Sequence, residues 1–212
     1  SIYEYNDCSF EAGFFCDAAS NNVTAAFNRC TYMNDSSIYN VVRFDKDPAT
    51  CTISFDGYQR ITDGVYNKAN EYLIINVNGL KWLATTVNEG TSFSGKNVTL
   101  CADIDLNNEE WAPIGKSGKA FSGKFDGQNH TISNLYISGN KSDVGLFGFT
   151  TNGEIKNLVV ENANVAGYLD VAVVAGTPYT SKYTNITVRG HVEVNGFAYV
   201  GAVGGKNAYA NW

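Results

Sequence analysis

The chain has 212 residues, of which 44% are hydrophobic and 17% are charged, and its formal net charge is −6. This length fits one large or two small domains, and the hydrophobic share excludes a disordered tail. The acidic balance argues against a nucleic-acid partner and against a polybasic membrane-binding surface. The longest apolar runs, such as residues 171–175, are far shorter than the roughly 20 residues of a membrane-spanning helix.

The residue types favour an all-β chain with many sharp turns. Gly occurs 21 times, Tyr 13 times and Phe 12 times, Pro occurs only 3 times, and Asn is also frequent. Gly and Asn tolerate the left-handed backbone of tight turns, whereas Tyr, Phe, Val, Ile and Thr are typical of strands. We therefore expect many short strands joined by turns.

The cysteines are concentrated near the N-terminus, where Cys8, Cys16, Cys30 and Cys51 precede the single later residue, Cys101. One interpretation is two disulfides in an exported segment, with three connectivities open; the other is four small buried hydrophobic residues. Cys101 lies in an apolar run and is expected in the core. No Cys-x-x-Cys pair is present, which argues against a zinc ribbon.

The pattern changes near residue 69. This predicts an N-terminal, Cys-containing β segment over residues 1–69 and a repeat region over residues 70–212. Within the first segment, Cys8, Cys30 and Cys51 recur at nearly equal spacings that resemble one turn of a β-solenoid. A small β-sandwich fits the same residues, so both interpretations stay open for residues 1–69.

One amphipathic helix is predicted over residues 78–89. Leu80, Leu83, Ala84 and Val87 follow the helical spacing i, i+3, i+4 and i+7, so they form one apolar stripe. Asn78 is expected to cap the start of this helix, and Gly90 is expected to end it. The open end of a solenoid core is an apolar surface that such a helix can cover.

Short strands are then predicted along the rest of the chain, at residues 98–102, 121–125, 130–137, 145–149, 155–160, 171–175, 183–188 and 200–203. Two sets of similar segments alternate among these strands, and they begin at Asn134, Asn157 and Asn185 and at Val144, Val171 and Val200. Repeats of this kind predict a stacked solenoid, because a single coil cannot bury its apolar face alone.

The run Gly-Leu-Phe-Gly at residues 145–148, followed by Ile-Lys-Asn-Leu at residues 155–158, resembles the GLUG-motif repeats of bacterial surface proteins, common in Bacteroides-like organisms. The stretch from residue 79 to residue 135 matches the usual opening of such a region. The resemblance covers about residues 70–212 and implies a right-handed parallel β-helix with the helix as its N-terminal cap. Because the chain stops at Trp212 just after a coil, further coils or a C-terminal cap are expected beyond it.

The densest group of carboxylates consists of Asp103, Asp105, Glu109, Glu110 and Asp126. Paired carboxylates can hydrolyse glycosidic bonds, and carboxylate oxygens can bind calcium. Asp side chains also organise turns, and most of these residues lie inside the repeat motif, so a structural role is favoured over a calcium site or catalysis.

Other candidates for chemistry are sparse. His130 and His191 are far apart in the sequence, no nucleophile-elbow or His-Glu-x-x-His motif is present, and both are interpreted as structural. Lys116, Lys119 and Lys124 could attract an acidic glycan but are interpreted as solvated surface residues. Asn-x-Ser/Thr sequons occur at Asn22, Asn34, Asn97, Asn129, Asn140 and Asn185, and they are interpreted as a by-product of Asn-rich turns.

The sequence therefore predicts a non-enzymatic protein, with no catalytic residues and no cofactor, that is exported to the cell surface or outside the cell. Its solenoid would bind a glycan or a host or surface protein, in the manner of an adhesin, or would assemble with further copies. No signal peptide is visible, and Ser1 is expected to be a mature or trimmed start. The alternatives are a β-helix enzyme that acts on polysaccharide and an accessory repeat region of a larger surface peptidase; GLUG repeats accompany adhesin-like proteins and also occur beside the catalytic region of immunoglobulin-cleaving peptidases.

Overall fold

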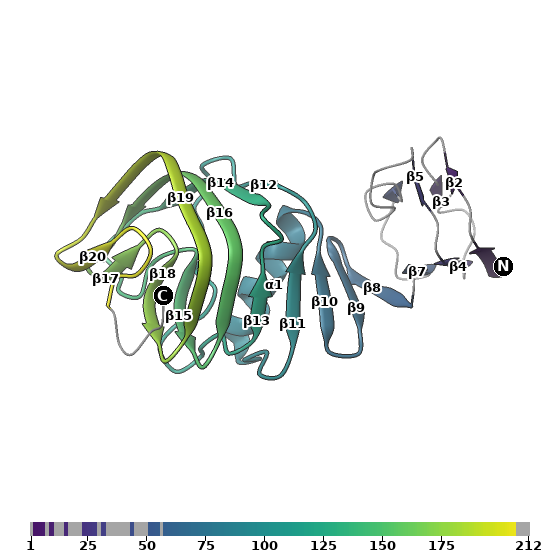
Figure 1. The fold of residues 1–212 in the computed structure, drawn as a ribbon, viewed down its shortest axis with the longest axis horizontal. Helices are drawn as coiled ribbons and strands as arrows, with labels where there is room; N and C mark the ends of the chain where they lie inside the picture. Colours follow the sequence, from purple (N-terminus) through teal and green to yellow (C-terminus); the bar gives the residue numbers. More distant parts are fainter. Residues whose placement is uncertain are drawn as a thin grey trace. The chain divides into compact units, whose positions relative to one another are not determined.

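The computed structural model describes residues 2–6, 9–10, 15–16, 23–28, 31–32, 43–44, 51–55 and 57–206 (Figure 1). The chain forms two compact units, residues 1–69 and residues 70–212. The expected fold class is confirmed, because the described part consists of strands and one helix and forms a β-solenoid of about five turns.

In residues 1–69 most described strands pair in parallel. The strands are β1 (Ile2–Asn6), β2 (Ser9–Phe10), β3 (Phe15–Cys16), β4 (Val23–Asn28), β5 (Thr31–Tyr32), β6 (Arg43–Phe44), β7 (Cys51–Phe55), β8 (Tyr58–Thr62) and β9 (Val65–Lys68). Parallel pairs join β1 to β4, β4 to β7, β2 to β5 and β3 to β6. The strands β7, β8 and β9 then pair antiparallel in chain order.

The four N-terminal cysteines fall largely outside this description. Cys8 and Cys30 lie outside the described residues, and only the backbone of Cys16 and Cys51 is described, so their disulfides stay a prediction. The strand register nevertheless corrects the spacing argument. The residues directly after Cys8 and Cys30 pair with each other, whereas Cys51 pairs with Val23. The described strands of this segment therefore do not repeat at one constant spacing.

Residues 70–212 contain the helix and the regular coils. Their elements are β10 (Glu71–Ile74), α1 (Val77–Glu89), β11 (Asn97–Leu100), β12 (Ile104–Asp105), β13 (Lys124–Asp126), β14 (Thr131–Ile137), β15 (Phe147–Thr151), β16 (Glu154–Ala166), β17 (Leu169–Ala172), β18 (Ala175–Tyr179), β19 (Lys182–Asn195) and β20 (Ala198–Gly201). Every strand pair between successive coils of this unit is parallel.

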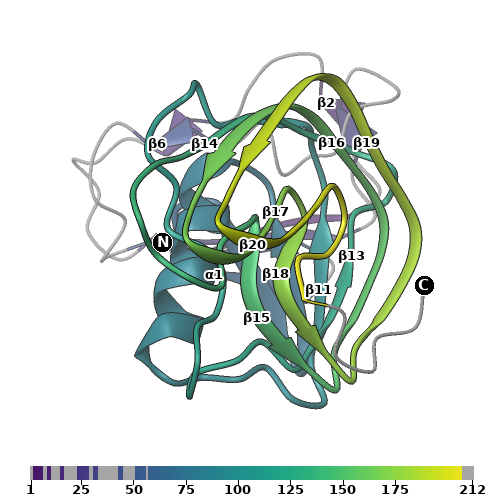
Figure 2. The same cartoon turned by 90° about the vertical axis from the view of Figure 1, so that its left-hand side faces the viewer.

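The coils stack into three walls. The first wall runs through β10, β11, β13 and the beginnings of β16 and β19. The second runs through β12, β14 and the remainder of β16 and β19. The third consists of the pairs β15–β18 and β17–β20. In Figure 2 the end of the solenoid that carries β20 faces the viewer, and β19, β16, β13 and β11 lie one behind another.

The core is built by residues that occupy the same position in successive coils. Val98 pairs with Phe125, Phe125 with Ile155, and Ile155 with Tyr183. All four are at most 2% exposed, because alternate residues of a strand point to the same side and this side faces the interior. Each side chain is therefore buried by the coil before it and the coil after it.

Aromatic rings fill the space between the first and third walls. Phe121 lies 6.2 Å from Phe93 and 5.5 Å from Phe147, and Phe147 lies 5.4 Å from Phe125, measured between ring centroids. These separations and the inclined ring planes are those that aromatic pairs prefer. The aromatic cluster thereby connects side chains from three successive coils, since Phe125 and Phe147 belong to the same coil.

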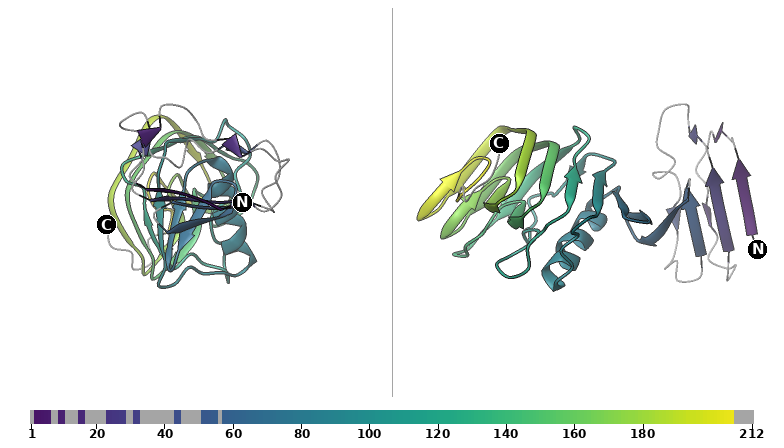
Figure 3. Two further views of the ribbon diagram at one scale, coloured as in Figure 1. Left: turned by 90° about the vertical axis from the view of Figure 1, so that its right-hand side faces the viewer. Right: turned by 60° about the horizontal axis from the view of Figure 1, so that its bottom comes forward.

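The helix α1 belongs to the first coil of this unit: it follows β10 and precedes β11 in the chain, and it lies beside the strands (Figure 3). The predicted stripe is confirmed, because Leu80, Leu83, Ala84 and Val87 are all buried, as is Gly79. Gly90 ends the helix as expected, with a φ of 126°.

The predicted N-cap at Asn78 was wrong, because the helix begins at Val77. Asn76 has an extended backbone, and its side-chain oxygen accepts a hydrogen bond from Gly79 N at 3.0 Å. An N-cap side chain reaches the amide two or three residues ahead, and Asn76 is the residue with that position.

The two repeat sets are correct except at one member. Val144, Val171 and Val200 lie in register, and so do the segments that begin at Asn157 and Asn185. Asn134, however, lies on the second wall, because the following residue pairs with Ala163. The error arose because the same local pattern, Asn before Leu, occurs at Asn134 and at Asn157, which lie at two different corners.

Replacing Phe125 with Ala should destabilise the solenoid strongly. Removing a fully buried Phe ring costs about 3–5 kcal/mol, and here the lost ring contacts residues of both neighbouring coils. Phe125→Leu, which retains most of the volume, should cost about half as much. Urea unfolding followed by tryptophan fluorescence measures both; equal losses for the two variants would contradict tight packing at this position.

Candidate functional site

The first corner of the solenoid, between the first and second walls, carries three asparagines. Asn129, Asn157 and Asn185 have φ values of 63°, 51° and 53°, in the left-handed region that Asn tolerates better than most residues. The side-chain nitrogen of Asn185 donates to the side-chain oxygens of both Asn129 and Asn157, each at 3.0 Å. We call these three residues the asparagine ladder.

Asp126 extends the asparagine ladder into the preceding strand. Its carboxylate accepts hydrogen bonds from Asn157 Nδ2 and Gln128 N, both at 3.0 Å, and contacts Lys156 Nζ at 3.2 Å. Partial burial alone would raise the pKa of Asp126, but these bonds together hold that pKa below its usual range. The carboxylate therefore serves to join two coils.

The second corner repeats this arrangement. Asp105 accepts hydrogen bonds from Asn107 N and from Asn134 Nδ2, both at 2.8 Å, and the first of these is the main cause of its lowered pKa. Asn134 is in register with Asn162, whose side-chain oxygen accepts from His191 N at 2.9 Å. Asp105 and Asn134 thus have structural partners in successive coils.

Asp103 and His130 form an exposed pair. Asp103 Oδ1 lies 3.1 Å from His130 Nδ1 and accepts a hydrogen bond from Thr131 N at 2.8 Å. The Thr131 bond is the main cause of the lowered pKa of Asp103, and the histidine contributes in the same direction. The other histidine, His191, lies beside Glu193 at 3.2 Å and does not join this pair.

Glu109 and Glu110 contact residues outside the two corners. Glu109 forms an ion pair of 2.8 Å with Lys81 of α1. Glu110 accepts hydrogen bonds from Ser138 N at 3.0 Å and from Ser138 Oγ at 2.8 Å. The five predicted carboxylates therefore divide among separate contacts. Within the described ranges, no three His, Cys, Asp or Glu side chains lie close enough together to hold a metal ion, calcium included.

The third corner carries two acidic residues in register. Asp143 and Asp170 precede the paired residues Val144 and Val171, and both have a φ of 57°. Neighbouring strands are about 4.8 Å apart, so the two carboxylates are close neighbours. Burial is the main cause of the raised pKa of Asp170, and the Asp143 charge adds to it. Asp170 Oδ1 is buried without a hydrogen-bond partner among the described residues.

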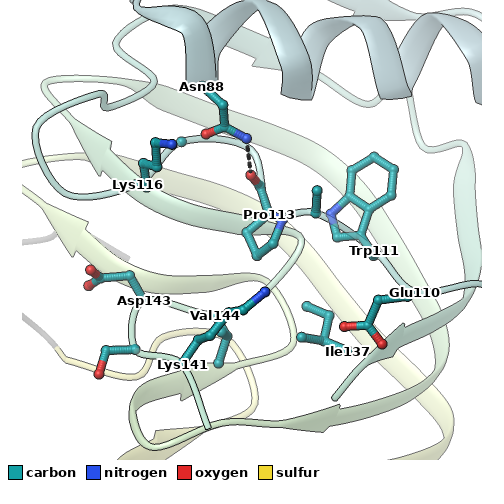
Figure 4. Close-up of a pocket in the computed structure, with 12 residues that line it drawn as sticks. Asn88, Glu110, Trp111, Pro113, Lys116, Ile137, Lys141, Asp143 and Val144 are labelled. Carbon is teal, nitrogen blue, oxygen red and sulfur yellow. Dashed lines mark hydrogen bonds between the residues drawn. The ribbon is translucent and has the colours of Figure 1, made fainter. Parts of the chain in front are cut away.

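Two adjoining cavities lie between α1 and the loop that follows β12. One cavity, of about 350 Å³, is drawn in Figure 4; the other, of about 390 Å³, is lined largely by residues of α1. Both are lined by Asn88, Glu110, Trp111 and Ala112. We call the two cavities together the helix groove. Asp103, Asp105 and Asp126 do not line it.

Several polar side chains line the cavity shown in Figure 4. Asn88 Nδ2 donates to Pro113 O at 2.9 Å, and Asn88 Oδ1 is buried without a hydrogen-bond partner among the described residues. Lys116, Lys141 and Asp143 also line this cavity. Sequence analysis singled out only Lys116 of these four; the recurrence of Asp before Val at residues 143 and 170 was a signal that could have revealed Asp143.

The remaining predicted residues are distributed over the surface. Lys119 Nζ donates to Glu89 O at 3.4 Å, and Lys124 lies on the first wall opposite Glu154. Cys101 is a free, half-buried cysteine, and burial raises its pKa to about 11, so it is an unreactive thiol at neutral pH.

The sequons differ in what their side chains do. Asn97 and Asn140 are exposed, whereas Asn129 and Asn185 belong to the asparagine ladder. Asn22 and Asn34 lie outside the described residues.

These features define a parallel β-solenoid whose corners are joined by stacked polar side chains. The chain is 36% identical over 123 residues to halomucin of Haloquadratum walsbyi, a match that covers 51% of this chain and 1% of that protein. It is 32% identical over 100 residues to a protein of Evansella cellulosilytica described as a Gly-rich membrane protein, with coverage of 45% and 11%.

The chain thus spans only a small part of either relative. No family model matches it, and no solved structure matches it. The resemblance to GLUG-motif repeats is therefore supported at the level of the β-solenoid fold, and membership of that particular family stays a prediction. In the described part of the chain, no helix has the length and apolar character required to span a bilayer.

The asparagine ladder can be tested by substitution at Asn157. Asn157→Ala removes two side-chain hydrogen bonds and places a less tolerant residue at a φ of 51°, which should cost about 2–4 kcal/mol. Asn157→Gly removes the same bonds but accepts that backbone, so it should cost less. Urea unfolding should give the order wild type, Gly, Ala in decreasing stability; equal stability of all three would contradict the ladder's role.

The third corner predicts a stability change with pH. The pKa of Asp170 is raised in the folded state, so its contribution is favourable when it is protonated and is lost as pH rises through that pKa. Asp170→Asn should therefore raise the melting temperature at neutral pH and have little effect in acid.

Asp126→Asn is the matched control for this experiment. The pKa of Asp126 is lowered, so its contribution is present above the unfolded value and is lost as pH falls through the folded value. This variant should lower the melting temperature at neutral pH, again with little effect in acid. Thermal unfolding at the two pH values measures both, and the same sign for both variants would refute the assignment.

Proposed function

We propose that this chain is a non-enzymatic solenoid segment of an exported surface protein, which presents rigid β-walls for binding or for assembly. The observation that carries this proposal is that polar side chains at the corners form hydrogen bonds between successive coils. The carboxylates of Asp105 and Asp126, which could have carried chemistry, instead accept hydrogen bonds from asparagines of the next coil. Such bonds stiffen a long surface without requiring any reaction.

The relatives support an extracellular setting. One of them is described as a membrane protein, and the match to halomucin occupies 1% of a far longer chain. A segment that is similar to parts of longer proteins suits a role as a structural or binding module, because each coil contacts only its neighbours and coils can be added freely. A glycan or a protein on another surface is the proposed partner.

Assembly with a further copy is supported by the last described coil. Phe197, directly before β20, is 76% exposed, and Tyr199, within β20, is 58% exposed. Tyr168 stacks on Phe197 with ring centroids 5.2 Å apart, so the apolar surface there is continuous. Exposed aromatic surface of this kind favours association with another chain or with another coil.

Catalysis is the alternative that one specific observation favours, because Asp103 and His130 form a carboxylate–imidazole pair. Such a pair can act as a general base when a substrate lies beside it. Incubation of the protein with acidic and neutral polysaccharides distinguishes the two proposals, since cleavage that Asp103→Asn abolishes would establish an enzyme.

Surface exposure can be measured directly on cells that make the protein. A membrane-impermeant, amine-reactive label should modify exposed lysines such as Lys182 in intact cells, to the same extent as after lysis. A cytoplasmic protein of the same cells is the control and should be labelled only after lysis. Labelling of this protein that also requires lysis would overturn the proposed location.

A further inference from the structure

We propose that the helix groove binds a neutral sugar residue, with the unpaired oxygen of Asn88 as its central hydrogen-bond acceptor. The neutral sugar would be the partner in the surface role proposed above, and its biological meaning rests on that proposed function. The binding itself is a property of the isolated protein. Its failure in solution can therefore be told apart from a failure of the proposed location.

The volume of the groove fits a small polar ligand. The cavity of about 350 Å³ in Figure 4 lies at the lower end of the range typical of small-molecule sites. Pro113 lies at its centre, and the buried side chains of Ile137 and Val144 close it from below. This gives an apolar contact for the C–H face of a sugar ring. The indole of Trp111 is only 4% exposed and forms part of the wall, so no ring stacking on it is required.

Asn88 supplies the acceptor. Its side-chain nitrogen must face Pro113 O, because a carbonyl oxygen can only accept, and the bond of 2.9 Å therefore fixes the orientation of the amide. The amide oxygen consequently points away from Pro113, on the side of Lys116 (Figure 4). It is buried and has no hydrogen-bond donor among the described residues. A buried acceptor left unpaired is costly, and a ligand hydroxyl would satisfy it.

The charged groups around Asn88 favour a neutral ligand over an ion. Lys116 and Lys141 contribute two positive charges, and neither forms an ion pair with another described residue. Glu110 and Asp143 contribute two negative charges. The Glu110 carboxylate accepts hydrogen bonds from Ser138, and the Asp143 carboxylate accepts one from Thr177. The lining is thus balanced in charge and offers both donors and acceptors.

A sugar hydroxyl matches this lining because it donates and accepts at the same time. It can donate to Asn88 Oδ1 while it accepts from an ammonium group of Lys116 or Lys141. An acidic sugar would satisfy the lysines but would meet the carboxylates of Glu110 and Asp143. A purely apolar ligand would leave Asn88 Oδ1 unpaired. The neutral sugar is therefore the occupant that satisfies most of the groups present.

The test uses nuclear magnetic resonance on the whole chain, with glucose, galactose, mannose and N-acetylglucosamine as separate probes and glucuronate and a tri-alanine peptide for comparison. The reporter is the indole N–H of Trp111, which lies in the groove wall and donates to Leu146 O at 3.1 Å. Trp82 is the internal control, because its ring packs on Tyr72 and Phe93 and does not line the groove. At least one neutral sugar should shift the Trp111 signal in a saturable way and leave Trp82 unchanged.

Two variants establish the site. Asn88→Ala removes the acceptor and should weaken binding about tenfold or more, since a site built to bond a hydroxyl loses much of its affinity without that bond. Ala112→Arg places a long side chain in the groove from an exposed position, keeps the Asn88–Pro113 bond, and should abolish binding even if Asn88→Ala proves unstable. Asn97→Ala, at an exposed asparagine outside the groove, should bind as the wild type does.

The possible outcomes distinguish a neutral sugar from the other ligand classes. A Trp111 shift with a neutral sugar that Ala112→Arg abolishes supports the proposal. A shift with glucuronate or with the peptide alone would overturn it in favour of that ligand class. The absence of any shift with all six probes would also overturn it, while leaving the surface-labelling result untouched.

Discussion

The structure depends on the in-register, parallel stacking of one coil on the next. A single coil has no interior of its own; Phe125 is buried because Val98 and Ile155 lie at the same position on either side. The parallel strand pairs join each coil to the next, so a change at one coil is transmitted to its neighbours before it affects the rest of the chain. Stability in such a molecule is the sum of many similar interfaces rather than the property of one central core.

Stacking also determines what the polar residues do. At each corner the backbone must turn sharply, and Asn or Asp in the left-handed conformation permits the turn. Once these residues stand in register, their side chains face the equivalent groups of the next coil and bond with them. The asparagine ladder and the bonds of Asp105 and Asp126 are examples in which the partner is favourable. Asp143 and Asp170 are the opposite case, since two like charges are brought together by the same geometry.

The helix groove exists because α1 interrupts this regularity. In later coils a strand of the second wall follows the first wall, whereas in the first coil α1 follows β10. The helix is joined to the loop after β12 by a few polar contacts, among them Lys81 with Glu109 and Asn88 with Pro113. The space left beside those contacts is the cavity lined by Trp111 and Asn88. A regular scaffold with one irregular element is an arrangement in which recognition can be localised without weakening the stack.

The sequence by itself determined the all-β solenoid, the single helix with its stripe of Leu80, Leu83, Ala84 and Val87, and the recurrence of Val144, Val171 and Val200. These follow from periodicity, which is a local property of the chain. Only the tertiary structure decided which asparagines stack, because Asn134 and Asn157 have the same local pattern and differ only in the corner they occupy. It alone also revealed the groove, since Asn88, Lys116 and Asp143 are distant in sequence and meet only when the coils are wound.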